Sequence, residues 1–185
     1  GQFHLDNSGY IVNSDNRGLT GYTVDTAGNI IASSPAPLQL SPADISPKVT
    51  SQFDVGLNLD ARAAVPTTAT FNPADPTSFT SSTSGTVYDS LGNDHVFTMY
   101  FVKTATAGQW NLHATVDGTA PANVNLGGGA GASIPLNFNS NGALTTTMPI
   151  AAASLTVGGG ATTPLAFSLD FQGSSQYGSD FYVNA

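Results

Sequence analysis

The sequence predicts an all-β protein, and three observations support this. All twelve acidic residues are aspartate, and glutamate is absent; aspartate favours turns and caps, whereas glutamate is a good helix former. The 20 glycines and 11 prolines, with many serines, threonines and asparagines, are typical of short strands joined by tight turns. Several segments alternate apolar and polar residues with a period of two, as Phe53–Leu59 does. We therefore expect almost no helix.

Composition also bounds the core and the class of partner. Hydrophobic residues make up 40% of the 185 residues, enough for a packed core. Four basic residues against twelve aspartates give a formal charge of −8. Such a charge repels phosphate groups and anionic lipid, which excludes nucleic acid and membrane surfaces as expected partners. Cysteine is absent, so disulfides and thiolate metal sites are excluded as well.

The first region, residues 1–34, predicts a meander of antiparallel hairpins. Its expected turns lie at Asp6–Gly9, Asp15–Gly18 and Ala27–Asn29. The strands expected between and around them are Phe3–Leu5, Tyr10–Val12, Leu19–Val24 and Ile30–Ala32. Four prolines then follow within thirteen residues, Pro35, Pro37, Pro42 and Pro47. Proline fixes an extended backbone and donates no ladder hydrogen bond. We place a boundary near residues 46–48, which gives domains 1–46 and 47–185.

The second region predicts about eight strands and an antiparallel β-barrel or sandwich. The expected strands are 52–60, 85–88, 94–102, 109–116, 136–138, 143–145, 155–157 and 165–171. Residues 61–84 are expected to form a loop, residues 118–132 a flexible surface loop, and residues 172–185 a polar tail rich in turns.

Two stretches resemble flagellar axial proteins. Gly1–Val12, continued by Leu19–Tyr22, resembles the segment shared by flagellar rod and hook proteins. Gly85–His95, followed by Tyr100–Thr104 and Trp110, resembles the outer domain of the flagellar hook protein family. Leu136–Leu144 and Phe167–Phe171 fit the same domain. The matches occur in family order across nearly the whole chain, although loops 61–84 and 118–132 carry no recognised motif.

The resemblance implies a partial inner hook domain at 1–46 and an outer hook domain at 47–185. It implies a structural subunit of a flexible helical tube that transmits motor torque to the filament, in contact with copies of itself and with rod, hook-cap and hook–filament junction proteins. The chain lacks the terminal helices that drive polymerisation in the family, so we expect the isolated chain to be monomeric. The resemblance implies an extracellular location in the bacterial flagellum, at the hook and basal body. No signal peptide is evident in the sequence, so we expect export without a cleaved signal.

Metal and calcium sites are weighed against simpler interpretations. His4, His95 and His113 are the histidines of the chain, and a zinc site needs two or three of them to converge with an aspartate. Their spacing does not demand this. Asp6–Gly9 and Asp89–Asp94 superficially resemble calcium loops, but the chain has no glutamate to close an EF-hand. We interpret both segments as hairpin turns, and expect no metal or cofactor.

Catalysis and carbohydrate binding are weighed in the same way. Asp54 and Asp170 are expected on the polar faces of their strands, where water keeps carboxylates ionised. A Gly-x-Ser-x-Gly elbow and a phosphate loop are absent from the sequence, so the chain is predicted not to be an enzyme. Tyr88, Phe97, Tyr100 and Trp110 are expected to be packing residues, although they leave open a carbohydrate-stacking face. An adhesin or carbohydrate-binding module is therefore the alternative, and a distal rod protein is disfavoured by the motif at 88–95.

Overall fold

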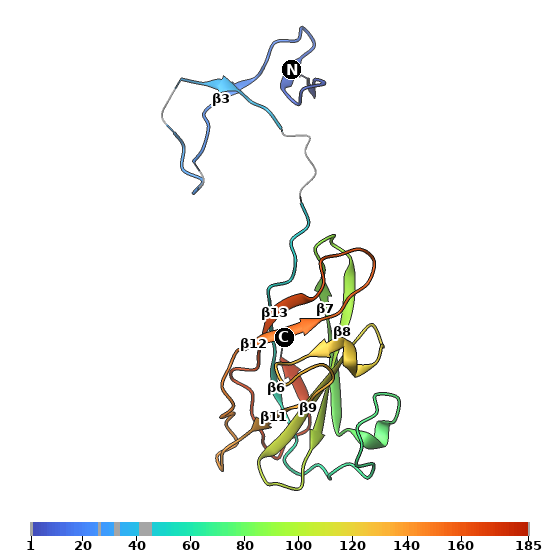
Figure 1. Cartoon of the computed structure of the whole chain (residues 1–185). Helices are drawn as coiled ribbons and strands as arrows, with labels where there is room; N and C mark the ends of the chain where they lie inside the picture. The colour runs from blue at the N-terminus through green and yellow to red at the C-terminus, as the bar shows by residue number, and fades with distance from the viewer. Residues whose placement is uncertain (1, 26, 32–33, 41–45, 185) are drawn as a thin grey trace. The chain divides into compact units, whose positions relative to one another are not determined.

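A computed structural model describes residues 2–25, 27–31, 34–40 and 46–184 of the chain. Ala32, at the end of one predicted strand, and Pro42 of the proline-rich stretch lie outside the described residues. The chain divides into two compact units, Gly1–Ser46 (the N-terminal unit) and Pro47–Ala185 (the C-terminal unit), shown in Figure 1.

The N-terminal unit contains short antiparallel pairs. Strand β1 (Phe3–Leu5) pairs with β2 (Ile11–Asn13), and β3 (Thr20–Gly21) pairs with β4 (Ala36–Pro37). The predicted strand at 30–32 is represented by an isolated bridge between Val24 and Ile30. Strand β4 lies in the proline-rich stretch, and the backbone donors that follow it are Leu38, to Leu19 O, and Leu40, to Gly9 O, which are not prolines.

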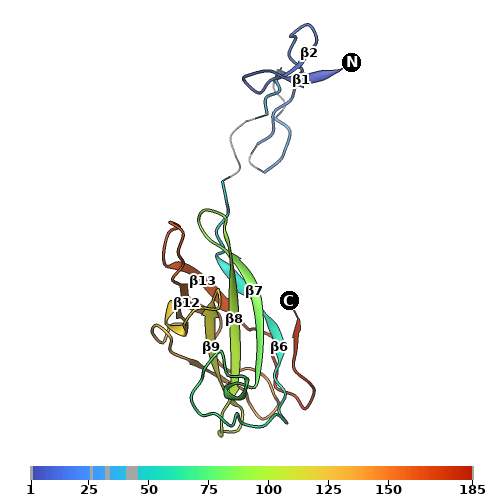
Figure 2. The same cartoon turned by 90° about the vertical axis from the view of Figure 1, so that its right-hand side faces the viewer.

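The C-terminal unit contains two four-stranded sheets (Figures 1 and 2). The first has the order β11–β9–β8–β7, with bounds Ile134–Asn137, Gln109–Val116, Asp94–Lys103 and Ser81–Tyr88. The second has the order β10–β12–β13–β5, with bounds Val124–Asn125, Ile150–Leu155, Leu165–Asp170 and Gln52–Asp54. A ribbon of β14 (Tyr182–Asn184) and β6 (Gly56–Asn58) completes the unit. The expected all-β sandwich is confirmed, with one parallel strand pair, β13 with β5.

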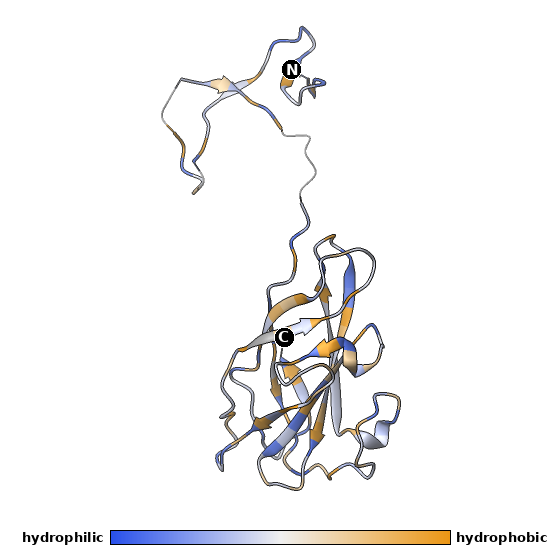
Figure 3. Cartoon of the chain, viewed as in Figure 1, coloured by the Kyte–Doolittle hydropathy of each residue, from blue (hydrophilic) through white to orange (hydrophobic). Residues whose placement is uncertain are grey.

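The core lies between the inward faces of the two sheets. Apolar residues alternate with polar ones along the strands (Figure 3). On β8, Phe97, Met99 and Phe101 are buried, and β9 contributes the fully buried Trp110. Helical structure among the described residues is limited to two short 3₁₀ turns, η1 (Pro76–Ser78) and η2 (Pro121–Asn123). None of the described helices is long and apolar enough to cross a membrane.

The predicted strand 52–60 is interrupted where its pairing partner ends. Strand β5 runs beside β13, whose last residue is Asp170, and Val55 N still donates to Asp170 O at 2.8 Å. Beyond this point β6 pairs with β14 instead. The period-two pattern therefore predicted an extended segment correctly, but not that it changes partner halfway.

Two predicted loops contain strands. In 61–84, strand β7 already begins at Ser81, although the run Ser81–Ser84 has no apolar residue to indicate this. It is held by the long neighbouring strand, since Ser81 pairs with Phe101. In 118–132, β10 pairs with β12, and Val124 and Leu126 are buried in the core. The surrounding glycines and alanines concealed this short alternation.

The strand boundaries near the C-terminus also differ from the prediction. The strand expected at 155–157 is β12, Ile150–Leu155, whose alanine-rich sequence has low β propensity but which pairs with β13. The tail expected to be turn-rich contains β14, and Phe181 packs against the core. At 143–145, the predicted hairpin arm is present as a bridge between Phe138 and Leu144.

Asn58 fixes the C-terminal segment from a fully buried position. Its Nδ2 donates to Ser179 O at 3.0 Å and Asp180 O at 3.3 Å, and its Oδ1 accepts from Tyr177 N at 2.9 Å. Asn58→Ala removes these partners, so we expect a loss of about 2 kcal/mol in the free energy of unfolding. Urea denaturation measures this loss. Asn111→Ala, on a half-buried position of β9, is the control, and an equal loss in both variants would contradict the assigned role.

Candidate functional site: the tip of the β7–β8 hairpin

The structure does not bring His95 and His113 together. His113 on β9 stacks on Phe71 with ring centroids 4.1 Å apart, and burial lowers its pKa. In the sheet it faces Tyr100, five residues along β8 from His95. His4 lies on β1 in the N-terminal unit. The described residues contain no group of three or more His or Asp side chains placed to hold a metal ion.

We define the hairpin tip as residues Asp89–Asn93. His95 lies beside this tip, between the carboxylates of Asp89 and Asp117. Its Nδ1 is 2.7 Å from Asp117 Oδ2, and its Nε2 is 3.3 Å from Asp89 Oδ2. Asp89 comes from the turn after β7, and Asp117 follows β9. The His95 side chain is 11% exposed, and the Asp89 side chain is fully buried.

Hydrogen bonds keep both carboxylates ionised. Burial raises the pKa of Asp89, but bonds from Asn93, Leu91 and His95 outweigh it and lower the pKa to about 2. Burial also raises the pKa of Asp117, but hydrogen bonds from His95 and the Val96 amide outweigh it and lower that pKa. The pKa of His95 is raised, chiefly by its bond to Asp117, against the opposing effect of burial and with support from Asp89.

The turn at Asp89 belongs to a type that recurs along the chain. In each case an Asp or Asn Oδ1 accepts from the backbone N–H groups two and four residues later. Among the described residues, those that do this are Asp6, Asn13, Asp25, Asp89, Asn125 and Asn139. The hairpin interpretation of Asp6–Gly9 and Asp89–Asp94 thus has a physical basis, because in both segments backbone N–H groups of the turn donate to the aspartate side chain. The repeated pattern of Asp/Asn with Gly or Asn three residues later was a detectable signal in the sequence.

Asp54 and Asp170 are neighbours in the parallel pairing of β5 with β13. Asp54 Oδ1 and Oδ2 accept from Gln52 Nε2 at 2.9 Å each, and Asp170 Oδ1 accepts from Gln172 N at 2.7 Å. Asp54 is exposed and Asp170 half-buried. This is a solvated pair without the apolar surroundings that a general acid requires.

The four aromatic candidates do not form a platform for sugar stacking. Trp110 and Phe97 are fully buried, and Trp110 Nε1 donates to Gln176 Oε1 at 2.9 Å. Phe71 and Phe79 lie against Tyr100, with ring centroids at 5.2 and 5.0 Å. Of the four, Tyr88 is the exposed one, at 47%. The packing interpretation is therefore supported, and nothing in this arrangement favours the carbohydrate-binding alternative.

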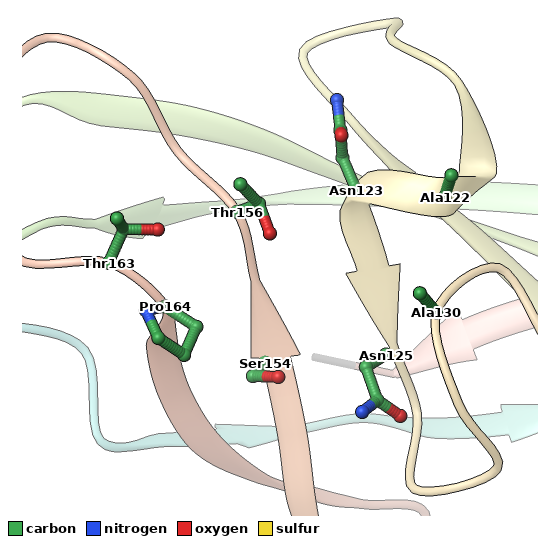
Figure 4. Close-up of a pocket in the computed structure, with 8 residues that line it drawn as sticks. All are labelled: Ala122, Asn123, Asn125, Ala130, Ser154, Thr156, Thr163 and Pro164. Carbon is green, nitrogen blue, oxygen red and sulfur yellow. The ribbon is translucent and has the colours of Figure 1, made fainter.

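A shallow depression of about 390 Å³ lies on the second sheet (Figure 4). Asn123 and Asn125 line it beside β10, and Ser154 and Thr156 line it from β12 and just beyond. None of its eight lining residues is titratable. Such a surface offers hydrogen bonds from amides and hydroxyls but no acid, base or nucleophile activated by a base.

Two cations of the C-terminal unit are used within it. Arg62 bridges Asp60 at 2.9 Å and Asp180 at 2.6 Å. Lys103 Nζ donates to the carbonyls of Ala61 at 2.6 Å and Ala63 at 2.7 Å. Lys48 remains as the cation of residues 46–184 without such a contact. The outer surface of this unit is therefore polar and acidic, with little positive charge to offer a partner.

Apolar side chains at the hairpin tip and on the strands beside it are exposed to solvent. The Phe71 and Phe79 rings cover the outer face of β8 at Tyr100. Towards the tip this cover is missing: Tyr88, Leu91 and Val96 are 47%, 54% and 47% exposed. An apolar group rimmed by Asp94 and Asp117 is a candidate contact surface for another protein.

Comparison with known proteins shows the family to which the chain belongs. A family model described as the flagellar basal body protein FlaE D2 domain matches residues 58–185. The chain is 33% identical over 178 residues to the flagellar hook protein FlgE of Salmonella typhimurium. The chain belongs to the flagellar hook protein family.

Relatives in this family match nearly all of the chain. The alignment with the Salmonella typhimurium hook protein covers 95% of this chain and 42% of that protein. The hook protein of Escherichia coli K12 is 31% identical over 181 residues, with the same two coverages. The chain thus spans 42% of the length of these hook proteins. The predicted family membership is confirmed.

Proposed function

We propose that this chain is part of a structural subunit of the flagellar hook, with Pro47–Ala185 as its outer domain and Gly1–Ser46 as part of its inner domain. The observation that carries the proposal is the family match to residues 58–185, which fall within the C-terminal unit. The hook proteins of Salmonella typhimurium and Escherichia coli extend the similarity across both units.

The proposed role is mechanical rather than catalytic. Asp89 is engaged in the turn of the hairpin tip and Asp117 in its contact with His95, and the residues that line the depression on the second sheet include no titratable group. Copies of the subunit would associate in a helical polymer through head-to-tail contacts that do not close. Polar contacts with few charges, together with the small apolar group at the tip, suit an interface that changes as the tube bends.

The proposed partners are other copies of the subunit and the neighbouring axial proteins of the rod, the hook cap and the hook–filament junction. The proposed location is extracellular, in the hook, after export without a cleaved signal peptide. Tyr88, Leu91 and Val96 are the side chains that we expect to contact a neighbouring protein, because they are the apolar residues left uncovered beside the tip.

Immunogold electron microscopy of detached flagella tests the proposal. Antibody raised against this chain should label the short curved segment between basal body and filament. The control is the same antibody after absorption with the purified chain, which should remove the label. Label confined to the straight rod would favour the rod alternative, and label on the cell surface away from flagella would favour an adhesin; either result would overturn the proposal.

A further inference from the structure

His95 lies between two carboxylates that also accept hydrogen bonds from other donors. Asp89 Oδ1 accepts from Leu91 N at 2.8 Å and Asn93 N at 2.9 Å, and its Oδ2 accepts from Asn93 Nδ2 at 2.9 Å. Asp117 Oδ1 accepts from Val96 N at 2.8 Å, and Asp117 N donates back to Val96 O at 2.9 Å. Both acids are thus oriented toward the imidazole by neighbouring donors, and the charge of the ring adds to these contacts.

The backbone at Asp117 supports a built site. Its φ is +51°, in the left-handed region that non-glycine residues rarely occupy. This conformation lets one residue pair with Val96 through both its amide and its side chain while its second oxygen faces His95. Backbone strain of this kind persists where surrounding contacts fix it.

The position of the His95 ring between two carboxylates favours its doubly protonated, cationic form. A neutral imidazole has one N–H, so it can donate to one carboxylate only. Here Nδ1 faces Asp117 Oδ2 and Nε2 faces Asp89 Oδ2, so a neutral ring would set a nitrogen lone pair against a carboxylate oxygen. We propose that His95 is a proton-dependent clamp: the imidazolium joins the hairpin tip to the end of β9, and loss of its proton releases the tip.

The two contacts should not break together. The bond to Asp117 is the shorter, at 2.7 Å against 3.3 Å, so a neutral ring keeps its remaining proton on Nδ1 and loses Asp89. The buried Asp89 carboxylate then loses a cationic neighbour, and the turn that it organises loosens. The Asp117–Val96 pairing stays closed.

The tip also contacts other parts of the unit. Ser90 Oγ accepts from Thr162 N at 2.8 Å, and Gly92 lies against Pro47, where the chain enters the C-terminal unit. The segment after Pro47 carries Lys48, Asp94 precedes His95 on β8, and residues 158–163 carry no charge. Asp89, Asp94, Asp117 and Lys48 are therefore the charged groups on the elements packed around the ring. A looser tip would also change how Tyr88 and Leu91 are presented.

NMR titration of the imidazole in the full chain tests the clamp. His95 should titrate above the ordinary histidine value of about 6.5. Asp89→Asn should lower that pKa while preserving the turn, because Asn139 builds the same turn with an amide oxygen. Asp25→Asn, at an equivalent turn without a histidine, is the matched control and should leave the His95 titration unchanged.

Stability and hydrogen exchange give separate readouts. Since the folded pKa is raised, the stabilisation by His95 is complete below the unfolded value and disappears as pH rises through the folded value. The difference in melting temperature between wild type and His95→Gln should therefore shrink from about pH 6 to about pH 9. Amides 91–93 should lose protection over this range while Val96 keeps it. A constant melting difference, or an Asp89→Asn variant with unchanged His95 titration, would overturn the clamp.

Discussion

A protein truncated to Pro47–Ala185 should melt cooperatively within a few degrees of the full chain, whereas Gly1–Ser46 alone should show no cooperative transition. The C-terminal unit has its own core, in which Phe97, Phe101 and Trp110 are fully buried between two sheets. With 139 of the 185 residues, it has the size of an ordinary domain. Such a unit does not need the preceding segment to remove its apolar side chains from water.

The N-terminal unit lacks such a core. Val12 is the buried apolar residue among its described positions, while Phe3, Val24 and Ile30 are 52%, 58% and 72% exposed. Its strands have two or three residues each. Chains of this size rarely fold without disulfides, metals or a partner, and this chain has no cysteine. Its exposed apolar side chains therefore contribute little burial to stabilise the unit alone.

Differential scanning calorimetry of the full chain, of 47–185 and of 1–46 measures the effect directly. The full chain should show one main transition, with an enthalpy close to that of 47–185 alone. Proton NMR provides a second measure, since the shorter peptide should lack amide dispersion. A truncated protein that melts more than about 10 °C lower, equivalent to several kcal/mol, would show that the first 46 residues stabilise the C-terminal unit.

The parts of the fold that the sequence predicted well have an inward face of large apolar residues. On β8, Phe97, Met99 and Phe101 alternate with polar or half-buried neighbours, and β9 and β13 follow the same rule. In these strands the pattern and the burial arise from one cause, because successive side chains point to opposite faces of the sheet. Their existence and approximate bounds therefore followed from composition and spacing.

Strands determined by their neighbours were not predictable in this way. Ser81–Ser84 is extended because it lies beside β8, and a local pattern does not record that neighbour. The hairpin tip shows the same limit. Asp89 and His95 are six residues apart, but Asp117 reaches His95 only through the pairing of β8 with β9. The sequence therefore indicated a turn at Asp89, but not that His95 would lie between Asp89 and Asp117, because that arrangement depends on the pairing of strands.

Gly142→Ala should destabilise the C-terminal unit by about 4 kcal/mol, and two costs combine in this value. Gly142 has φ of +77°, so any Cβ there costs about 1–2 kcal/mol in backbone strain. A Cβ would also lie 2.5 Å from Gln176 O and 2.8 Å from the Tyr177 ring. Relieving that collision displaces Gln176, whose amide donates to Gly142 O at 2.8 Å and whose side chain holds Trp110. Overpacking of this kind adds about 1–3 kcal/mol.

Gly173→Ala separates the two costs. Gly173 has φ of +83°, but a Cβ there would meet no atom within 4 Å, so this variant should lose about 1–2 kcal/mol, from strain alone. Guanidinium denaturation followed by fluorescence suits the comparison, because Trp110 is the chain's single tryptophan and lies beside the disturbed segment. Gly142→Ala should also shift the native emission to longer wavelength, and Gly173→Ala should not. Equal losses of stability would mean that residues 176–177 yield freely and that their packing against the turn at Asn139 contributes little to holding Trp110 in the core.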